Sequence, residues 1–92
     1  MSVDTVIHSI SRLHRRFTEH PESFSPAGRS LVLAVLGCMR DPLMKEDVEG
    51  FNSYIDGLLG REPDMADFIL DELFEHLGIH DRDQLSAILA AE

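Results

Sequence analysis

The chain has 92 residues, of which 43% are apolar and 27% charged, and its formal net charge at pH 7 is −9. This length and apolar content indicate one folded domain with a single core and exclude an intrinsically disordered chain. Residues 1–40 carry a net charge of +2, whereas residues 41–92 carry −11. The acidic second half disfavours DNA, RNA and anionic membranes as partners, because their phosphates would be repelled.

The sequence also indicates where the protein resides. Its first four residues, Met-Ser-Val-Asp, lack the basic region of a signal peptide, and its longest uncharged apolar run is far shorter than the roughly 18 residues that span a bilayer. Cys38 is the single cysteine, so no internal disulfide can form and a cytoplasmic location is expected. Because Cys38 has apolar neighbours, we expect an inert thiol in the core.

Residues 2–19 are expected to form the first helix, capped by Ser2. Apolar residues recur at helical spacing and gather on one face of this helix. This face consists of Val3, Val6, Ile7, Ile10, Leu13 and Phe17. His14 falls within this face. The opposite side carries three basic residues that should point into solvent: Arg12, Arg15 and Arg16. They could contact an acidic partner or RNA, or serve solubility alone. In the loop that follows, Phe24 is expected to pack onto the next helix.

The most apolar segment is expected to be a central helix over residues 26–40. Ser25 is a good N-cap, and the helix should end at Asp41-Pro42, because the residue before a proline disfavours the helical conformation. One face consists of small residues, namely Ala27, Ser30, Ala34, Gly37 and Cys38. A helix that is apolar around most of its circumference is usually surrounded by other helices. A second interpretation is that the small face, or Leu33, is the seam of a homodimer.

After Pro42, a third helix is expected to run to about Leu59. Its apolar stripe contains Met44, Val48, Phe51, Ile55, Leu58 and Leu59. Gly50 and Gly57 each weaken this helix by about 1 kcal/mol relative to alanine, so its last turn should fray or end early.

The fourth helix is expected over residues 63–77, with Gly78 as its left-handed C-terminal cap. One side of it is apolar and contains Met65, Ile69, Leu70, Leu73, Phe74 and Leu77. The other side carries the acidic ridge, which we define as Asp64, Asp67, Asp71 and Glu75. Phe68 projects next to this ridge, where it is exposed unless another helix or loop covers it.

The fifth helix should begin at His80-Asp81, where Asp81 and Gln84 resemble a capping box, and continue to the C-terminus. No strand, repeat or low-complexity segment is predicted, and the loops are short. The sequence therefore predicts an all-α fold: a compact single domain over residues 1–92, in which the apolar helix 26–40 is surrounded by four amphipathic helices.

A metal sensor or small metal-dependent enzyme is one alternative function. Glu72 and His76 are spaced i, i+4 on the fourth helix, His80 follows shortly after, and His14 could join them if the first helix packs nearby. However, the chain has no His-x-x-x-His pair and no cysteine cluster, and a lone Glu–His pair is common by chance. We therefore expect a surface side-chain pair, with no metal or other cofactor.

Other site types are disfavoured by the residues at their essential positions. A helix-turn-helix in the fourth and fifth helices would present Asp81 and Asp83 to phosphates with only Arg82 to offset them. A calcium loop ending at Glu92 would have Ser86 where glycine is required. No phosphate-binding loop or recognisable nucleophile is present, so we do not expect an enzyme.

Surface recognition remains as the predicted function. An exposed aromatic side chain flanked by carboxylates is typical of an interface anchor with a charged rim. We therefore expect a non-enzymatic adaptor, regulator, inhibitor or accessory subunit that binds a basic or amphipathic protein surface through Phe68 and the acidic ridge. An alternative is an acidic inhibitor that mimics nucleic acid in the groove of a basic enzyme, because fourteen acidic residues lie within residues 41–92.

Overall fold

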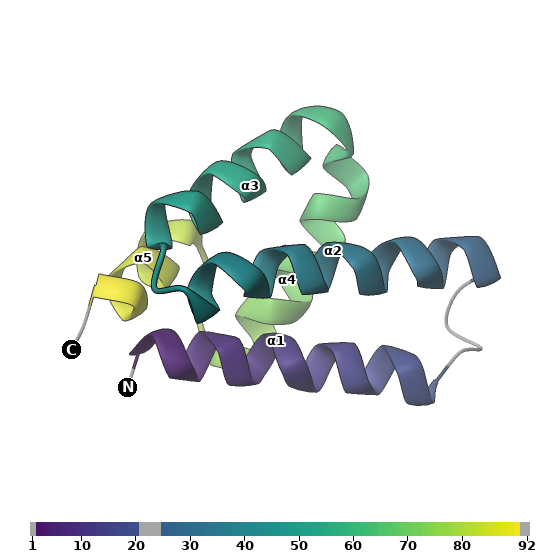
Figure 1. Ribbon diagram of the computed structural model, residues 1–92, viewed down its shortest axis with the longest axis horizontal. Helices are drawn as coiled ribbons and strands as arrows, with labels where there is room; N and C mark the ends of the chain where they lie inside the picture. The colour runs from purple at the N-terminus through teal and green to yellow at the C-terminus, as the bar shows by residue number, and fades with distance from the viewer. Residues whose placement is uncertain (1, 21–24, 91–92) are drawn as a thin grey trace.

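Figure 1 shows the computed structural model, which describes residues 2–20 and 25–90. Within these residues the chain forms five α-helices and no strand. The helices are α1 (Ser2–Glu19), α2 (Pro26–Met44), α3 (Val48–Arg61), α4 (Pro63–Leu77) and α5 (Arg82–Ala90). α1 and α2 run antiparallel side by side, α3 packs on α2, and α4 packs on α3 and α1. The radius of gyration is 12.5 Å, close to the roughly 12 Å expected for a compact domain of this length. The predicted all-α five-helix fold is confirmed.

One apolar core joins all five helices. α1 packs against α2, α4 and α5, whereas α2 packs mainly against α1 and α3. α2 is less enclosed than the sequence pattern predicts, because much of its small-residue face is exposed. The exposed residues of this face are Ala27, Ser30, Ala34 and Cys38. Small side chains bury little apolar area, so leaving them in water costs little free energy.

α2 does not end at Asp41-Pro42 but continues to Met44. Proline within a helix removes a backbone donor and costs about 3 kcal/mol. Continuing the helix buries Leu43, which is only 1% exposed, and burial of a leucine side chain contributes about 1.5–3 kcal/mol. The carbonyl of Pro42 then accepts hydrogen bonds from the backbone N–H groups of Lys45 (3.1 Å) and Asp47 (2.8 Å), which terminate the helix.

The C-terminal end of α4 and the start of α5 form largely as predicted. Gly78 adopts the left-handed conformation, with φ of 72°. The N–H of Gln84 donates to the carboxylate of Asp81 at 2.9 Å, which is the expected capping bond. The side chain of Gln84 accepts from the N–H of His80, one residue before the cap, at 2.5 Å. α5 therefore begins at Arg82, and both sides of the predicted capping box make hydrogen bonds.

Two further helix starts depend on side-chain caps. Ser25 Oγ accepts from the N–H of Gly28 at 3.1 Å, as predicted. α3 starts later than predicted, because the Asp47 carboxylate accepts from the N–H of Gly50 at 2.9 Å and begins the helix at Val48. α3 also runs on to Arg61 instead of ending near Leu59. The expected cap by the Ser2 side chain and the expected packing of Phe24 lie outside the described part of the structure.

None of the helices in the described residues combines the length and the apolar character that crossing a membrane requires.

Candidate partner-binding surface

The acidic ridge of α4 lies on the surface. All four of its carboxylate residues, Asp64, Asp67, Asp71 and Glu75, are exposed. The opposite side of α4 is buried in the core through Ala66, Ile69, Leu70 and Leu73. The helical repeat of 3.6 residues explains this division, because each face recurs after three or four positions. The ridge therefore presents four negative charges along one side of a single helix.

Phe68 lies beside the ridge and is 36% exposed. Its ring packs on that of Phe17 from α1, with centroids 5.9 Å apart and an interplanar angle of 32°. Phe17 is itself buried in the core. Phe68 therefore rests on a rigid aromatic neighbour, while about a third of its surface remains accessible to a partner.

Arg16 is not grouped with the other two basic residues of α1. Its Nη2 atom lies 3.2 Å from Oε2 of Glu72 on α4, and its guanidinium lies over the Phe17 ring, 5.6 Å from the centroid. The side chain of Arg16 is exposed, as expected for a residue on the solvent side of α1, but its guanidinium also pairs with α4. The ion pair joins residues 56 positions apart and lies beside the Phe17–Phe68 contact, and helical periodicity within α1 could not reveal it.

Arg12 and Arg15 remain exposed on α1. Together with His8 and Ser11 they line a shallow hollow of about 370 Å³. Ser11 Oγ accepts a hydrogen bond of 3.3 Å from Arg40 of α2. This basic surface is formed by α1, and none of the residues that line its hollow belongs to the acidic ridge.

A second hollow, of about 410 Å³, borders the ridge where α4 ends. Its lining residues are Asp71, Phe74, Glu75, Gly78, Ile79 and His80. The left-handed turn at Gly78 creates this site, because it redirects the chain so that the N–H of Ile79 donates to the carbonyl of Phe74 at 2.9 Å. An apolar contact between these two positions usually accompanies this helix ending. The sequence Phe-x-x-x-Gly-Ile is the local signal that could have predicted the hollow.

The candidate metal ligands are not brought together. No group of three His, Cys, Asp or Glu residues within the described ranges is arranged to hold an ion. Glu72 pairs with Arg16 of α1. His76 is exposed, His80 lines the hollow after α4, and His14 is half-buried on α1. The metal site considered as an alternative gains no support from this arrangement, and the ion pair that Glu72 forms is with Arg16 instead of the expected His76.

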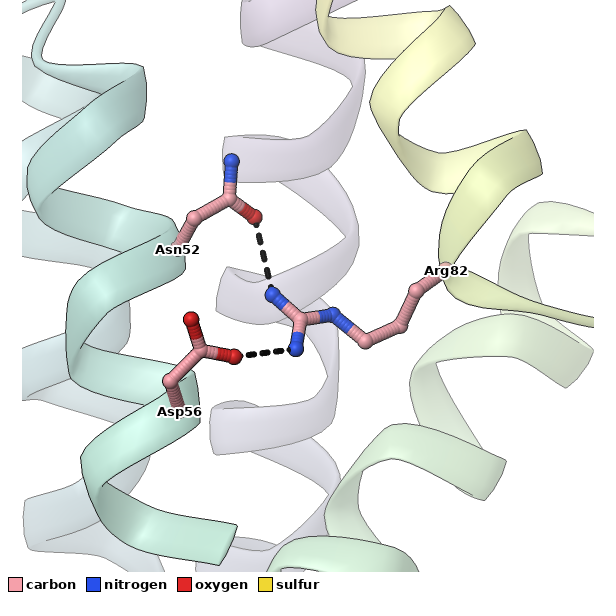
Figure 2. A network of polar contacts seen from close by, with 3 residues as sticks. All are labelled: Asn52, Asp56 and Arg82. Atoms are coloured by element: carbon pink, nitrogen blue, oxygen red, sulfur yellow. Dashed lines mark hydrogen bonds and ion pairs between the residues drawn. The ribbon is translucent and has the colours of Figure 1, made fainter.

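A polar network fixes α5 against α3 (Figure 2). Arg82 Nη1 lies 2.5 Å from Asp56 Oδ1, and Arg82 Nη2 donates to Asn52 Oδ1 at 3.1 Å. A partly exposed pair of this kind contributes about 0–1 kcal/mol, but its geometry restricts how α5 lies. The sequence pattern suggested phosphate as the only contact of Arg82, whereas its guanidinium is bound to α3.

Cys38 is exposed, so the prediction of a core thiol is wrong. It lies on the exposed small-residue face of α2, close enough to Tyr54 of α3 to influence the Tyr54 phenol. Burial raises the pKa of Tyr54 above its ordinary value of 10.0, the contact with Cys38 raises it further, and nearby Arg61 opposes the rise. The apolar neighbours of Cys38 in sequence misled the prediction, because they belong to other faces of the helix.

In comparisons with known proteins, no family model, curated protein or solved structure matches this chain.

Proposed function

We propose that this protein is a non-enzymatic, cytoplasmic binding module that docks a basic or amphipathic segment of another protein onto α4. In this role it would act as an adaptor, regulator, inhibitor or accessory subunit. The observation that carries the proposal is the setting of Phe68, which is accessible to solvent, supported by Phe17 and adjacent to four exposed carboxylates.

The environment of Phe68 favours a role as a binding anchor. Hot-spot residues are commonly aromatic side chains that enter a desolvated pocket of the partner, surrounded by a polar rim. Because Phe68 already rests on Phe17, little conformational entropy is lost when a partner covers its remaining surface. The ion pair with Arg16 offsets the charge of Glu72 on the α1 side, whereas all four carboxylates of the acidic ridge are exposed to a partner.

The hollow after α4 supports a basic partner. The aliphatic stem of a lysine or arginine could lie on Phe74 and Ile79, while its cationic group meets Asp71 and Glu75 at the rim. Such charge complementarity mainly accelerates association, so added salt should slow binding.

The proposal is tested by affinity capture from the native host, comparing wild type with a Phe68→Ala/Asp71→Lys variant. We expect the variant to lose the specific partner, because removal of a hot-spot aromatic typically costs at least about 2 kcal/mol, or roughly thirtyfold in Kd. Met44→Ala is the matched control, since Met44 is a large exposed apolar residue of α2. This control variant should retain the partner.

Two outcomes would contradict the proposal. Capture of the same partners by a correctly folded Phe68→Ala/Asp71→Lys variant would exclude this surface. If DNA bound beforehand to a captured partner prevents its binding, the acidic nucleic-acid mimic becomes the better interpretation. Circular dichroism of each variant confirms that helical content is unchanged.

A further inference from the structure

A groove of about 280 Å³ lies where α2, α3 and α4 meet. Its lining residues are Leu31, Val35, Tyr54, Leu58, Arg61, Glu62 and Met65. Leu31 is 45% exposed and lines the groove together with the half-buried Tyr54 and Met65, so accessible apolar surface is grouped here. The exposed small residues of α2, including Ala34 and Cys38, belong to the same helix as Leu31. The groove is thus bordered by a helix whose backbone another helix could approach closely.

The charges around this groove restrict the occupant. Its lining contains one cation, Arg61, and one anion, Glu62, which are adjacent in sequence and both exposed. None of the acidic-ridge residues lines it. Two copies that each carry a net charge of −9 would repel one another across most orientations, but they could meet at this locally balanced surface.

We propose that the occupant is a second copy of this chain, which docks through a two-fold symmetric interface. In such an interface the same patch of both copies is used, so Arg61 of each copy can oppose Glu62 of the other. Leu31 of each copy enters the groove of the other, and the small residues of α2 allow the two helices to lie close together. This dimer does not depend on partner binding by Phe68, because the two surfaces share no residue.

Tyr54 provides an internal probe of the groove. It lines the groove and is half-buried, and the chain contains one tyrosine and no tryptophan. Intrinsic fluorescence therefore reports this one position. If a second copy covers the groove, quenching of Tyr54 by acrylamide should decrease as protein concentration rises.

The primary test is sedimentation equilibrium of the full chain over a range of concentrations. We expect a dimer with twice the monomer mass of 10.4 kDa. Leu31→Asp should raise the dimer dissociation constant by at least about tenfold, because symmetry places the new carboxylate in both grooves. Met44→Asp is the matched control, since Met44 is 63% exposed and does not line the groove. A wild-type chain that remains monomeric at all concentrations would overturn the proposal, as would a dimer that Leu31→Asp leaves unchanged.

A charge exchange tests the symmetry separately. Arg61→Glu and Glu62→Arg should each weaken the dimer, because each creates two like-charge contacts across the two-fold axis. The double variant Arg61→Glu/Glu62→Arg should restore it, since opposite charges meet again. Weakening without restoration in the double variant would overturn the proposed pairing. The Phe68→Ala/Asp71→Lys variant should still dimerise, which distinguishes failure of this inference from failure of the proposed function.

Discussion

Phe68 on α4 and Leu31 on α2 are both large apolar side chains exposed to solvent, but their surroundings differ. Phe68 rests on a core residue and lies beside a row of carboxylates. Leu31 forms part of a groove whose two charged residues have opposite signs. Similar apolar exposure therefore favours different partners: the acidic surroundings favour a basic protein, and the balanced surroundings favour a second copy of the chain.

The largest change in stability is expected when the aromatic support beneath Phe68 is removed. Phe17→Ala should lower the free energy of unfolding by about 3–5 kcal/mol, because Phe17 is buried and its truncation leaves a cavity. Leu31→Ala should lower it by less than about 1.5 kcal/mol, because much of Leu31 is already in water. Urea unfolding at low protein concentration measures both, since dimer formation would otherwise add to the apparent stability. Equal losses would mean that Leu31 is as deeply packed as Phe17.

A smaller loss of stability is expected from substitution of Gly78, which lies in the turn that shapes the hollow after α4. Gly78→Ala should lower the free energy of unfolding by about 1–2 kcal/mol, because a side chain is strained at a φ of 72°. Gly57→Ala is the matched control within α3, where an added Cβ meets no atom within 4 Å. This control should stabilise the protein by up to about 1 kcal/mol through helix propensity. Thermal unfolding of both variants separates the two effects, and destabilisation by both would refute the conformational explanation.

The features that sequence analysis predicted correctly are local. The cap at Ser25 and the turn at Gly78 each depend on residues within a few positions, and so do the bonds between Asp81 and Gln84. Helical periodicity likewise places the acidic ridge on one face of α4 before any tertiary contact is known. The position of Phe68 beside that ridge follows from the same periodicity.

The features that the sequence did not reveal depend on distant parts of the chain. α2 continues through Pro42 because burial of Leu43 offsets the lost backbone donor, and that burial depends on neighbouring helices. The pairing of Arg16 with Glu72 also requires knowledge of how α1 lies on α4. The exposure of Cys38 follows from the incomplete enclosure of α2. Local patterns determine which face of a helix is apolar, but not which neighbours cover it.

The smallest expected effect on stability concerns Tyr54 at the α2 groove. Burial raises the pKa of its phenol, Cys38 raises it further, and Arg61 opposes the rise. A raised pKa means that the native state favours the neutral phenol. This contribution to stability is complete below the ordinary pKa of 10.0 and is lost as pH rises through the native-state value. The free energy of unfolding should therefore fall more steeply above pH 10 in wild type than in Tyr54→Phe.

Urea unfolding at a series of alkaline pH values measures this difference, and absorbance of the single tyrosine follows the phenol directly. Repeating the titration at several protein concentrations tests whether a second copy covers Tyr54. If a second copy covers the groove, further burial should raise the pKa of Tyr54 as concentration increases, whereas Leu31→Asp should abolish that dependence. A phenol that titrates at its ordinary value in the folded protein would contradict the burial of Tyr54, and with it the structure of the groove.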